Sequence, residues 1–476
     1  MNTNISGANL LTIGYSEGKI LGLALNIIAE HFTATNEAEV LALLKKVKEY
    51  PESFLDDPIM QKLATTMIEE ATAKTSDTIE LLTREEAKEY SIFGESYIEE
   101  GARNQMDIAM KLPVTIAGAL MPDAHQGYGL PIGGVLATNN SIIPYGVGVD
   151  IGCRMALSIF DIPEKHYFGK DDKYKRELIA FTRFGAGREF RGLERADHEV
   201  MENEAFNATP FLKNLHGKAW AQLGTSGGGN HFVEWGIIEF AERDEVLNID
   251  KGRYVALLTH SGSRGLGATI AGHYTKLAKE ICKLPKEAVN LAYLDLNSAE
   301  GQEYWIAMNL AGDYASACHE VIHKRLTKAI GAKVLAKVEN HHNFAWKETL
   351  NGEEVIVHRK GATPAGKGVM GIIPGSMTAP GFLVRGKGED SSINSASHGA
   401  GRLMSRTKAI QSITKSDMKS ILKDHGVTLI GAGLDEAPMA YKDIHQVMAA
   451  QTDLVDVIAK FEPKMVRMAD DGSRED

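Results

Sequence analysis

The sequence has few cysteines, no long apolar run and no excess of basic residues. Its 476 residues contain only three cysteines, Cys153, Cys282 and Cys318, which are too few and too scattered for a disulfide framework. No stretch of 18 apolar residues is present, so we expect no membrane span. The first residues lack the basic and apolar regions of a signal peptide, and we therefore expect a cytoplasmic protein.

The composition and the charge distribution exclude further classes of protein. Hydrophobic residues make up 43% and charged residues 24%, which excludes a mainly disordered chain. The net charge of −11 is uneven, because residues 1–100 contain 18 acidic and 8 basic residues whereas the other 376 contain 45 and 44. This acidic balance argues against nonspecific coating of nucleic acid. Residues 358–408, with eight Lys or Arg and two acidic residues, still allow a local basic groove.

Residues 1–92 are predicted to form an acidic helical segment. Asn36 and Glu39 have the spacing of a capping box, and apolar residues follow at helical intervals. Asp57 followed by Pro58 indicates a second helix start, and Thr83 with Glu86 has the capping-box spacing again. The segment carries no chemical motif, so we expect an appended module or an oligomer surface.

Residues 93–476 are predicted to form one α+β domain, with a large mixed sheet core and surrounding helices. Short apolar runs that end in glycine-rich polar loops predict buried strands over 114–119, 155–162, 254–259 and 355–357. Helices are expected over 303–328 and 416–425. The loops that follow the strands are expected to converge on one site.

Three glycine-rich segments are similar to well-known sites but each lacks a required part. Residues 361–368 follow the phosphate-binding loop but have glycine in place of the magnesium-binding hydroxyl. Residues 224–228 have the spacing of a hydrolase nucleophile elbow, yet poor helix formers follow them. Residues 262–267 lack dinucleotide-binding spacing and are interpreted as a tight loop.

Five histidines stand at strand ends or in glycine- and asparagine-containing loops: His125, His231, His260, His342 and His398. Asp150 and Cys153 form a D-x-x-C pattern among glycines. One carboxylate, one thiolate and several imidazoles suit a borderline transition metal such as Mn, Co, Zn or Fe, and a thiolate can bridge two such ions. Each residue alone is more simply a hydrogen-bonded histidine or an inert buried thiol. Their shared context favours a metal site.

Basic residues near the same loops are expected to bind phosphate, because Arg matches it bidentately and Lys acts as a point charge. They are Arg264, Arg359, Lys360, Arg385, Lys387, Arg402 and Arg406. If a helix starts at Ala400, His398 lies at its N-terminal end, where free N–H groups favour phosphate and the imidazole can attack phosphorus. The alternative for Arg402 and Arg406 is a solvated helix face.

Together these motifs resemble the RtcB family of RNA ligases. The matching segments are MPDAHQGYGLPIGGV, GVGVDIGC, GGGNHFVEW, HSGSRGLG, HHN, VHRKGA, IPGSM, SASHGAGRLMSR and DEAPMAYKDI, within residues 113–450. The resemblance implies an RtcB-like fold and a ligase that depends on GTP and two Mn²⁺ ions. Its substrates would be RNA with a 3′-phosphate or 2′,3′-cyclic phosphate end and RNA with a 5′-hydroxyl end, in tRNA splicing or RNA repair. An activating protein is a further expected partner.

The resemblance also implies roles for individual residues. It implies a guanylylated histidine at His398 and metal ligands at Asp150, Cys153, His231, His260 and His342, with Cys153 bridging. Nucleotide contacts are implied at Asn230, His231, Phe232, Val233, Glu234, His342, Asn343, Pro374, Gly375, Ser376, Met377, His398, Gly399, Ala400, Gly401 and Tyr441. Phosphate or RNA contacts are implied at Lys360, Arg264 and Arg402. Asp123 or His125 is expected to orient or deprotonate a hydroxyl.

Two departures from the family pattern concern the nucleotide. Gly381 stands where the family usually has a serine that contacts it, and the ending MVRMADDGSRED replaces the usual Val-Lys-Gly tail. Lys464 or Arg467 is the nearest substitute for the tail lysine, and Glu234 remains for the guanine edge. Two other function classes stay open: a two-metal phosphodiesterase or nucleotidyl transferase, and a non-catalytic RNA-binding relative. The complete set of metal-type ligands and Lys360 disfavours the second.

Overall fold

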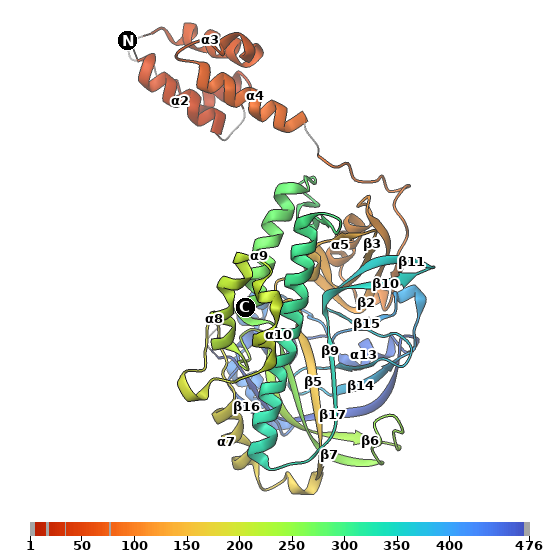
Figure 1. The fold of residues 1–476 in the computed structure, drawn as a ribbon. Helices are drawn as coiled ribbons and strands as arrows, with labels where there is room; N and C mark the ends of the chain where they lie inside the picture. The colour runs from red at the N-terminus through yellow and green to blue at the C-terminus, as the bar shows by residue number, and fades with distance from the viewer. Residues whose placement is uncertain (1–4, 16–18, 34, 76–77, 471–476) are drawn as a thin grey trace. The chain divides into compact units, whose positions relative to one another are not determined.

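The computed structural model describes residues 5–15, 19–33, 35–75 and 78–470 (Figure 1). The chain divides into two compact units, Met1–Ile79 and Glu80–Asp476. Residues 80–92, which were predicted to belong to the acidic helical segment, make their contacts in the second unit. There β1 (Ser91–Ile92) pairs with β2 (Thr115–Tyr128), and the Leu82 amide donates to the Lys111 carbonyl. No helix in the described part of the chain is long and apolar enough to cross a bilayer.

The first unit is helical, with α1 (Gly7–Thr12), α2 (Lys19–His31), α3 (Glu37–Glu49) and α4 (Gln61–Thr75). Asn36 caps α3 by accepting a hydrogen bond from the Ala38 amide, as its position predicts. Asp57 accepts from the amides of Ile59 and Met60 just before α4. The apolar faces of these helices form a small core of their own around Leu44, Val47, Leu63 and Ala64.

The second unit is built on two sheets. The larger sheet has the order β13 (Met370–Ile373), β14 (Gly381–Gly386), β17 (Val455–Met468), β6 (Phe232–Phe240), β7 (Gly252–Ser261), β5 (Arg154–Pro163) and β9 (Val334–His341), with β16 (Thr428–Ile430) parallel to β17. The smaller sheet has the order β1, β2, β3 (Leu130–Thr138), β11 (Glu353–Lys360) and β10 (Asn343–Leu350). Short ladders join β12 (Ala362–Pro364) to β15 (Ser395–Ser397) and β4 (Ser141–Ile142) to β8 (Leu294–Asp295). The predicted α+β fold with a mixed sheet core is therefore confirmed.

Helices cover one face of the larger sheet. They are α7 (Asp171–Phe181) and α10 (Ala299–Ile330), and Figure 1 shows α10 running along the sheet. Helix α9 (Arg264–Ile281) packs on α10, and α8 (Pro210–Gln222) packs on α9. On β7, Val255 and Leu257 pack on the helix side with Ile322 of α10. Leu258 packs on the opposite side in a separate core. Because the middle of β7 is buried on both faces, its sequence is apolar without a break from Tyr254 to Leu258 instead of alternating.

Several predicted elements agree with the structure. The strands predicted over 155–162 and 254–259 are β5 and β7, and the helices predicted over 303–328 and 416–425 are α10 and α12 (Lys415–Asp424). The segment after residues 224–228 enters strand β6, so the nucleophile-elbow geometry is absent there.

Other predicted boundaries are wrong. Strand β2 continues past Ala119 to Tyr128, because register shifts against β3 allow the PDAHQGY segment to stay in the sheet. The segment 262–267 is not only a loop, since α9 begins at Arg264. Thr83 and Glu86 do exchange both capping-box hydrogen bonds, but the residues that follow form a turn and no helix.

Candidate active site

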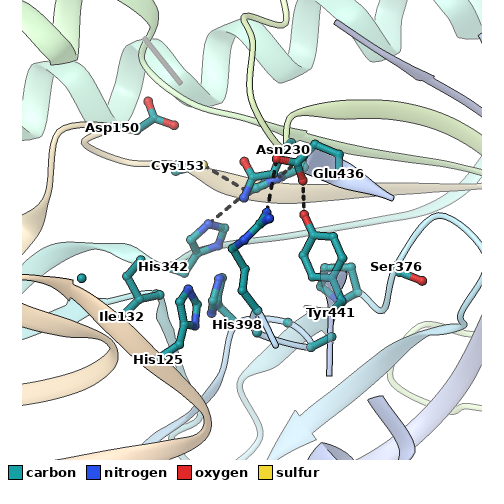
Figure 2. A pocket seen from close by; sticks show the side chains of 18 of the residues that line it. His125, Ile132, Asp150, Cys153, Asn230, His342, Ser376, His398, Glu436 and Tyr441 are labelled. Carbon is teal, nitrogen blue, oxygen red and sulfur yellow. Dashed lines mark hydrogen bonds and ion pairs between the residues drawn. The ribbon is translucent and has the colours of Figure 1, made fainter. Parts of the chain in front are cut away.

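A cavity of about 650 Å³ lies where the ends of the strands of the larger sheet meet loops of the second unit (Figure 2). Side-chain alternation selects which strand residues reach it. On β7, Thr259 hydrogen-bonds to histidines of α10, whereas the next residue, His260, lines the cavity. On β6, Trp235 packs on the helix side, whereas Glu234 lines the cavity. The cavity thus occupies the face of the sheet opposite the helices.

Strand register places four cavity-lining residues in one row across the sheet. Met155 of β5 pairs with His260 of β7, His260 pairs with Phe232 of β6, and Phe232 pairs with Met468 of β17. All four line the cavity. Because these four residues belong to paired strands, their positions in the cavity wall do not depend on loop conformation.

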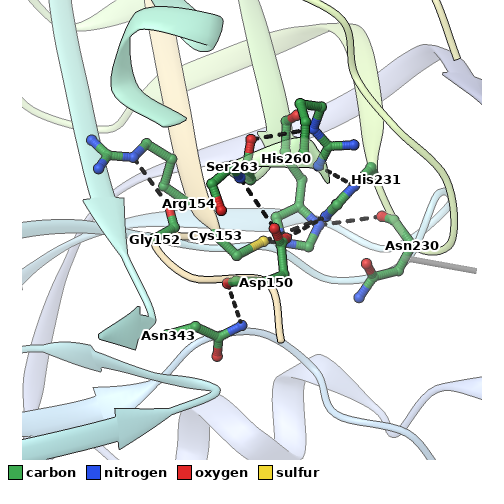
Figure 3. Close-up of polar contacts among 12 residues, drawn as sticks. Asp150, Gly152, Cys153, Arg154, Asn230, His231, His260, Ser263 and Asn343 are labelled. Atoms are coloured by element: carbon green, nitrogen blue, oxygen red, sulfur yellow. Dashed lines mark hydrogen bonds and ion pairs between the residues drawn. The ribbon is translucent and has the colours of Figure 1, made fainter. Parts of the chain in front are cut away.

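The donor atoms of a thiol, a carboxylate and three imidazoles meet beside this row (Figure 3). Cys153 Sγ lies 3.5 Å from His231 Nε2 and 3.2 Å from His260 Nε2. His231 Nε2 lies 3.0 Å from Asp150 Oδ2, and His260 Nε2 lies 3.2 Å from His342 Nε2. All five side chains are buried. The structure therefore brings together the five residues that the resemblance marked as metal ligands, and their role stays a prediction.

Burial keeps two of these imidazoles neutral. It lowers the pKa of His260 to about 3 and holds the pKa of His342 well below its usual value. His260 Nδ1 lies 3.2 Å from the Asn230 carbonyl, which only accepts, so this nitrogen carries the proton. The lone pair of Nε2 then faces Cys153 and His342, which is the arrangement a metal ligand needs.

Asp150 stays ionised although burial alone would raise its pKa. The hydrogen bond and charge of His231 and the charge of Arg264 hold the pKa of Asp150 below its usual value. Its Oδ1 accepts a hydrogen bond from the Ser263 amide at 3.1 Å. A Cβ on Gly262 would overlap this carboxylate, so the glycine makes room for Asp150 at the start of α9.

The Asp150–Cys153 turn is tied to the segment that carries His342. The Gly152 amide donates to the Asn343 carbonyl at 2.8 Å, and the His342 amide donates to the Cys153 carbonyl at 3.0 Å. Gly152 has φ of 70° and packs closely against Gly312 of α10, which restricts this position to glycine. These backbone bonds fix Cys153 and His342 relative to each other.

His398 lies directly after β15 and faces the same cluster. Its Nδ1 lies 2.6 Å from Asp123 Oδ2, and its ring centroid lies 5.0 Å from that of His342. Burial opposes ionisation of Asp123, but His398 and Lys442 hold the pKa of this carboxyl below its usual value. Asp123 therefore orients His398, and its action on a hydroxyl stays a prediction. The sequence offered no signal for this pairing, because the two residues are 275 positions apart.

No helix starts at Ala400, so His398 does not lie at a helix N-terminus. Gly401 has φ of 73°, and Ser405 caps α11 (Arg406–Ser412) by accepting from the Lys408 amide. A residue in the left-handed region cannot continue a helix from Ala400. His398 consequently receives no stabilisation from a helix dipole.

Most of the basic residues expected to bind phosphate already have acidic partners. Arg359 is fully buried and forms a two-point ion pair with Glu348 of the neighbouring strand. The other pairs are Arg385 with Asp244, Lys387 with Asp456, and Arg406 with Asp435 and Glu436. Arg264 is fully buried behind His231, with Nη2 2.9 Å from its Nδ1. Of the full set, Lys360, Arg402 and Arg406 line the cavity.

Two buried acids line the cavity. Burial raises the pKa of Glu234 well above its usual value. Burial also raises the pKa of Glu436, although Arg406 and Arg402 oppose the shift. Tyr441 donates a hydrogen bond to Glu436. Sequence reasoning missed Glu436, although the acidic pair in the DEAPMAY motif was a signal for it.

The cavity gathers most of the remaining residues that the resemblance assigned to the nucleotide. Lining it are Asn230, Phe232, Asn343, Pro374, Gly375, Ser376, Met377, Gly399, Ala400, Gly401, Arg402 and Tyr441. Val233 is buried in the core on the helix side, so its side chain is turned away. Gly381 also lines the cavity. Arg467 instead donates to the Leu178 carbonyl, Lys464 lies 3.6 Å from Glu462, and residues 471–476 of the altered tail lie outside the described residues.

The chain is similar to known proteins across this site. A family model described as tRNA-splicing ligase RtcB matches residues 105–208 and 188–469. "RNA-splicing ligase RtcB1" of Escherichia coli is 34% identical over 414 residues, which cover 80% of this chain and 97% of the relative. "tRNA-splicing ligase RtcB" of Nanoarchaeum equitans is 30% identical over 416 residues, which cover 73% of this chain and 87% of the relative. Asp150, Cys153 and the cavity histidines all fall within the segments that the family model matches.

Proposed function

This chain belongs to the RtcB family of RNA-splicing ligases, and from that premise we propose that it joins RNA 3′-phosphate or 2′,3′-cyclic phosphate ends to 5′-hydroxyl ends, using GTP and two manganese ions. The observation that carries the proposal is the position of His398 beside the Cys153 cluster, with 5.0 Å between the His342 and His398 ring centroids. A nitrogen nucleophile and a set of metal-type donor atoms then share one cavity. The reaction would serve tRNA splicing or RNA repair.

The donor set fits borderline transition-metal ions. Asp150 and His231 form one close pair, His260 and His342 form another, and Cys153 Sγ lies near one histidine of each pair, so its thiolate would be the ligand shared by both pairs. Two manganese ions held there would polarise phosphate oxygens and offset the charge of the leaving group. Arg264 donates to His231 Nδ1, and Asp150 Oδ2 lies 3.0 Å from His231 Nε2. Metal loading would release the proton of the Cys153 thiol.

Asp123 fixes the reactive tautomer of His398. Because Nδ1–H donates to the carboxylate, the lone pair of Nε2 is available to attack the α-phosphorus of GTP. A P–N bond forms, and the P–O bond to pyrophosphate breaks. An oxygen of the RNA 3′-phosphate next attacks the same phosphorus, the P–N bond breaks, and the RNA end carries GMP. A 2′,3′-cyclic end first requires opening by water.

The second half of the reaction forms the RNA linkage. The 5′-hydroxyl attacks the activated 3′-phosphate, and GMP leaves with the electron pair of the broken P–O bond. His125 is the candidate base for the hydroxyl proton. Burial lowers its pKa to about 4, and its Nδ1 lies 3.1 Å from the Asp123 carbonyl. Its Nε2 lone pair is therefore available to the cavity.

Glu234 is the candidate for recognising the nucleotide base. A carboxylate accepts hydrogen bonds from both N1–H and the 2-amino group of guanine, whereas adenine offers one donor and one acceptor. Burial raises the Glu234 pKa, so binding of guanine would restore its charge. We expect Glu234→Gln to lower the preference for GTP over ATP, measured as the ratio of labelling rates. Labelling by both nucleotides in the wild type would remove this role.

Labelling with α-³²P-GTP and manganese tests the proposal. We expect acid-labile, alkali-stable label on the wild-type protein and none on His398→Ala. His425→Ala, which removes an exposed histidine at the end of α12, is the matched control and should keep the label. RNA cleavage without labelling by any nucleotide would instead indicate a phosphodiesterase. RNA binding without either reaction would indicate a non-catalytic relative.

Asp123→Asn separates orientation of His398 from metal binding. The substitution keeps the shape but removes the negative charge that stabilises the imidazole as it becomes cationic during attack. We expect single-turnover labelling to slow on the order of 10²-fold, with unchanged manganese content by atomic absorption. An unchanged labelling rate would show that Asp123 has only a structural role.

A further inference from the structure

The cavity has an end that neither the metal-type ligands nor the proposed nucleotide contacts occupy. Tyr128, Tyr145 and Val149 line it there. Tyr128 is 69% exposed although it belongs to strand β2. A large aromatic ring exposed at the mouth of a cavity is unusual, because most such rings are buried in a core.

Two lysines surround the second tyrosine. The Nζ of Lys360 lies 4.9 Å from the Tyr145 ring centroid, and the Nζ of Lys279 lies 5.6 Å from it. Lys360 also donates to the carbonyls of Tyr128 and Tyr145, at 2.5 and 3.2 Å. One lysine therefore ties the two tyrosines together, and the Tyr128 and Tyr145 ring centroids lie 6.4 Å apart.

The backbone holds Tyr128 rigidly. The next residue, Gly129, has φ of 71°, and a Cβ there would lie 2.8 Å from the Asn290 carbonyl oxygen. Tyr128 also pairs with Leu130 across the turn between β2 and β3. The backbone of Tyr128 is thus held by a sheet and a tight turn. Stacking of a partner on the exposed ring therefore costs little conformational entropy of the protein.

The arrangement of the cavity indicates which substrate meets these rings. Figure 2 shows Ser376 and Tyr441 at one side, His125 and Ile132 at the other, and His398 between them. Tyr128 follows His125 along β2, so it belongs to the His125 side. If the GTP base occupies the side of Ser376 and Tyr441, an RNA end has to reach His398 from the side of His125.

We propose that the exposed ring of Tyr128, with Tyr145 beside it, forms a stacking subsite for the nucleobase at an RNA end, and that Lys360, which also lines the cavity, faces its phosphates. The proposal rests on the ligase function proposed above. Aromatic rings beside cations are the usual means of holding single-stranded nucleic acid, because every base has a face that stacks. The subsite would therefore accept any of the four bases and would require only that a base be present.

Removal of one base from the RNA tests the subsite directly. Two substrates are made in which the terminal base is replaced by hydrogen, one on the 3′-phosphate strand and one on the 5′-hydroxyl strand. Stacking contributes roughly 5-fold to 150-fold per base, so we expect the wild-type kcat/KM to fall by that amount for one of the two. The affected strand identifies which RNA end uses the tyrosines.

Substitution of Tyr128 then tests whether the ring causes this discrimination. In Tyr128→Ala the natural and base-free substrates should react equally, at the wild-type rate for the base-free one. Tyr128→Phe should keep the discrimination, and Tyr128→Leu, which retains apolar volume without a ring, should lose it. Tyr50→Ala removes a ring of similar exposure, 65%, in the first unit and should behave as the wild type.

Each outcome either supports or overturns the subsite. A Tyr128→Ala or Tyr128→Leu enzyme that slows equally on both substrates and keeps the discrimination would show that the ring is only structural. A wild-type enzyme indifferent to both base-free ends would overturn the proposal outright. Failure of the wild-type protein to take label from GTP would overturn the ligase function instead, so the two failures are distinguishable.

Discussion

Two clusters of buried histidines lie on opposite faces of strand β7, and they differ in how their ring nitrogens are satisfied. On the helix side, Ser158 Oγ lies 2.7 Å from His323 Nδ1, and Thr259 Oγ1 lies 2.9 Å from His323 Nε2 and 2.5 Å from His319 Nδ1. His319 Nε2 lies 3.1 Å from the Ser261 carbonyl. A single chain of hydrogen bonds therefore gives every ring nitrogen of His319 and His323 a partner while both rings are neutral.

The histidines of the cavity, His260 and His342, are not joined by such a chain of hydrogen bonds. His260 Nε2 and His342 Nε2 face each other at 3.2 Å with no hydroxyl between them, and His342 Nδ1 has no hydrogen-bond partner among the described residues. Burial lowers the pKa in both clusters, for His323 and His260 alike to about 3. Burial and a shifted pKa therefore do not distinguish a ligand site from a structural network. What differs is that the ligand-type atoms of the cavity cluster face one another directly, and that His342 Nδ1 has no hydrogen-bond partner among the described residues.

Loss of the bridging sulfur should reduce metal binding by the cavity cluster more than any other substitution. We expect Cys153→Ala to bind less than one manganese ion per chain and to lose labelling and ligation altogether, because both close pairs of ligands lose their shared atom. Circular dichroism and the unfolding temperature should change little, since the Cys153 backbone bonds remain. Metal content is measured by atomic absorption after dialysis.

The matched control is Cys318→Ala on the helix side of the sheet. Cys318 is fully buried in α10, and burial raises the pKa of its thiol, so it is an inert core residue. Its removal should leave two manganese ions bound and cost only the stability of a small cavity. Two bound ions and retained activity in Cys153→Ala would contradict the bridging role.

The contrast also shows what the sequence could predict. The apolar run before His260 predicted the strand, and the alternation along the strand then placed His260 and Thr259 on opposite faces. The pairing of His398 with Asp123 and of Arg359 with Glu348 could not be predicted, because partners from other strands are set by sheet register. Whether a helix starts at Ala400 could not be decided from the pattern either, because the left-handed conformation of Gly401 prevents it.

Adding a methyl group at Gly262 should weaken metal binding by less than the loss of Cys153 does. In Gly262→Ala the new Cβ would overlap the Asp150 carboxylate, so this ligand has to move. We expect one of the two manganese ions to bind about 10-fold to 100-fold more weakly, with the other unaffected. Isothermal titration of the apoprotein measures the two affinities.

Gly272→Ala is the control for this substitution. Gly272 lies in the same helix, α9, and a Cβ there meets nothing within 4 Å. Alanine should stabilise the helix by about 0.5–1 kcal/mol and leave both metal affinities unchanged. Equal metal affinities in Gly262→Ala and the wild type would show that Asp150 is not a ligand.

The smallest expected effect is the pH dependence that the helix-side network contributes to stability. Burial lowers the pKa of His323 to about 3, below the ordinary value of about 6.5. Between these values the unfolded state binds a proton that the folded state excludes, so acidification from about pH 6.5 removes stability. His323→Gln removes this term, and its free energy of unfolding should therefore fall less steeply than that of the wild type.

Chemical denaturation at several pH values measures the two slopes. The wild type and His323→Gln should differ by about 1 kcal/mol per pH unit below pH 6.5 and should run parallel above it. His166→Gln, at an exposed position after β5, should follow the wild type throughout. The same measurement with manganese compares the two faces of β7, because manganese should leave the contribution of His323 to the pH dependence of unfolding unchanged. A His323 term that disappeared when manganese was added would mean that the helix-side network and the cavity cluster titrate as one unit.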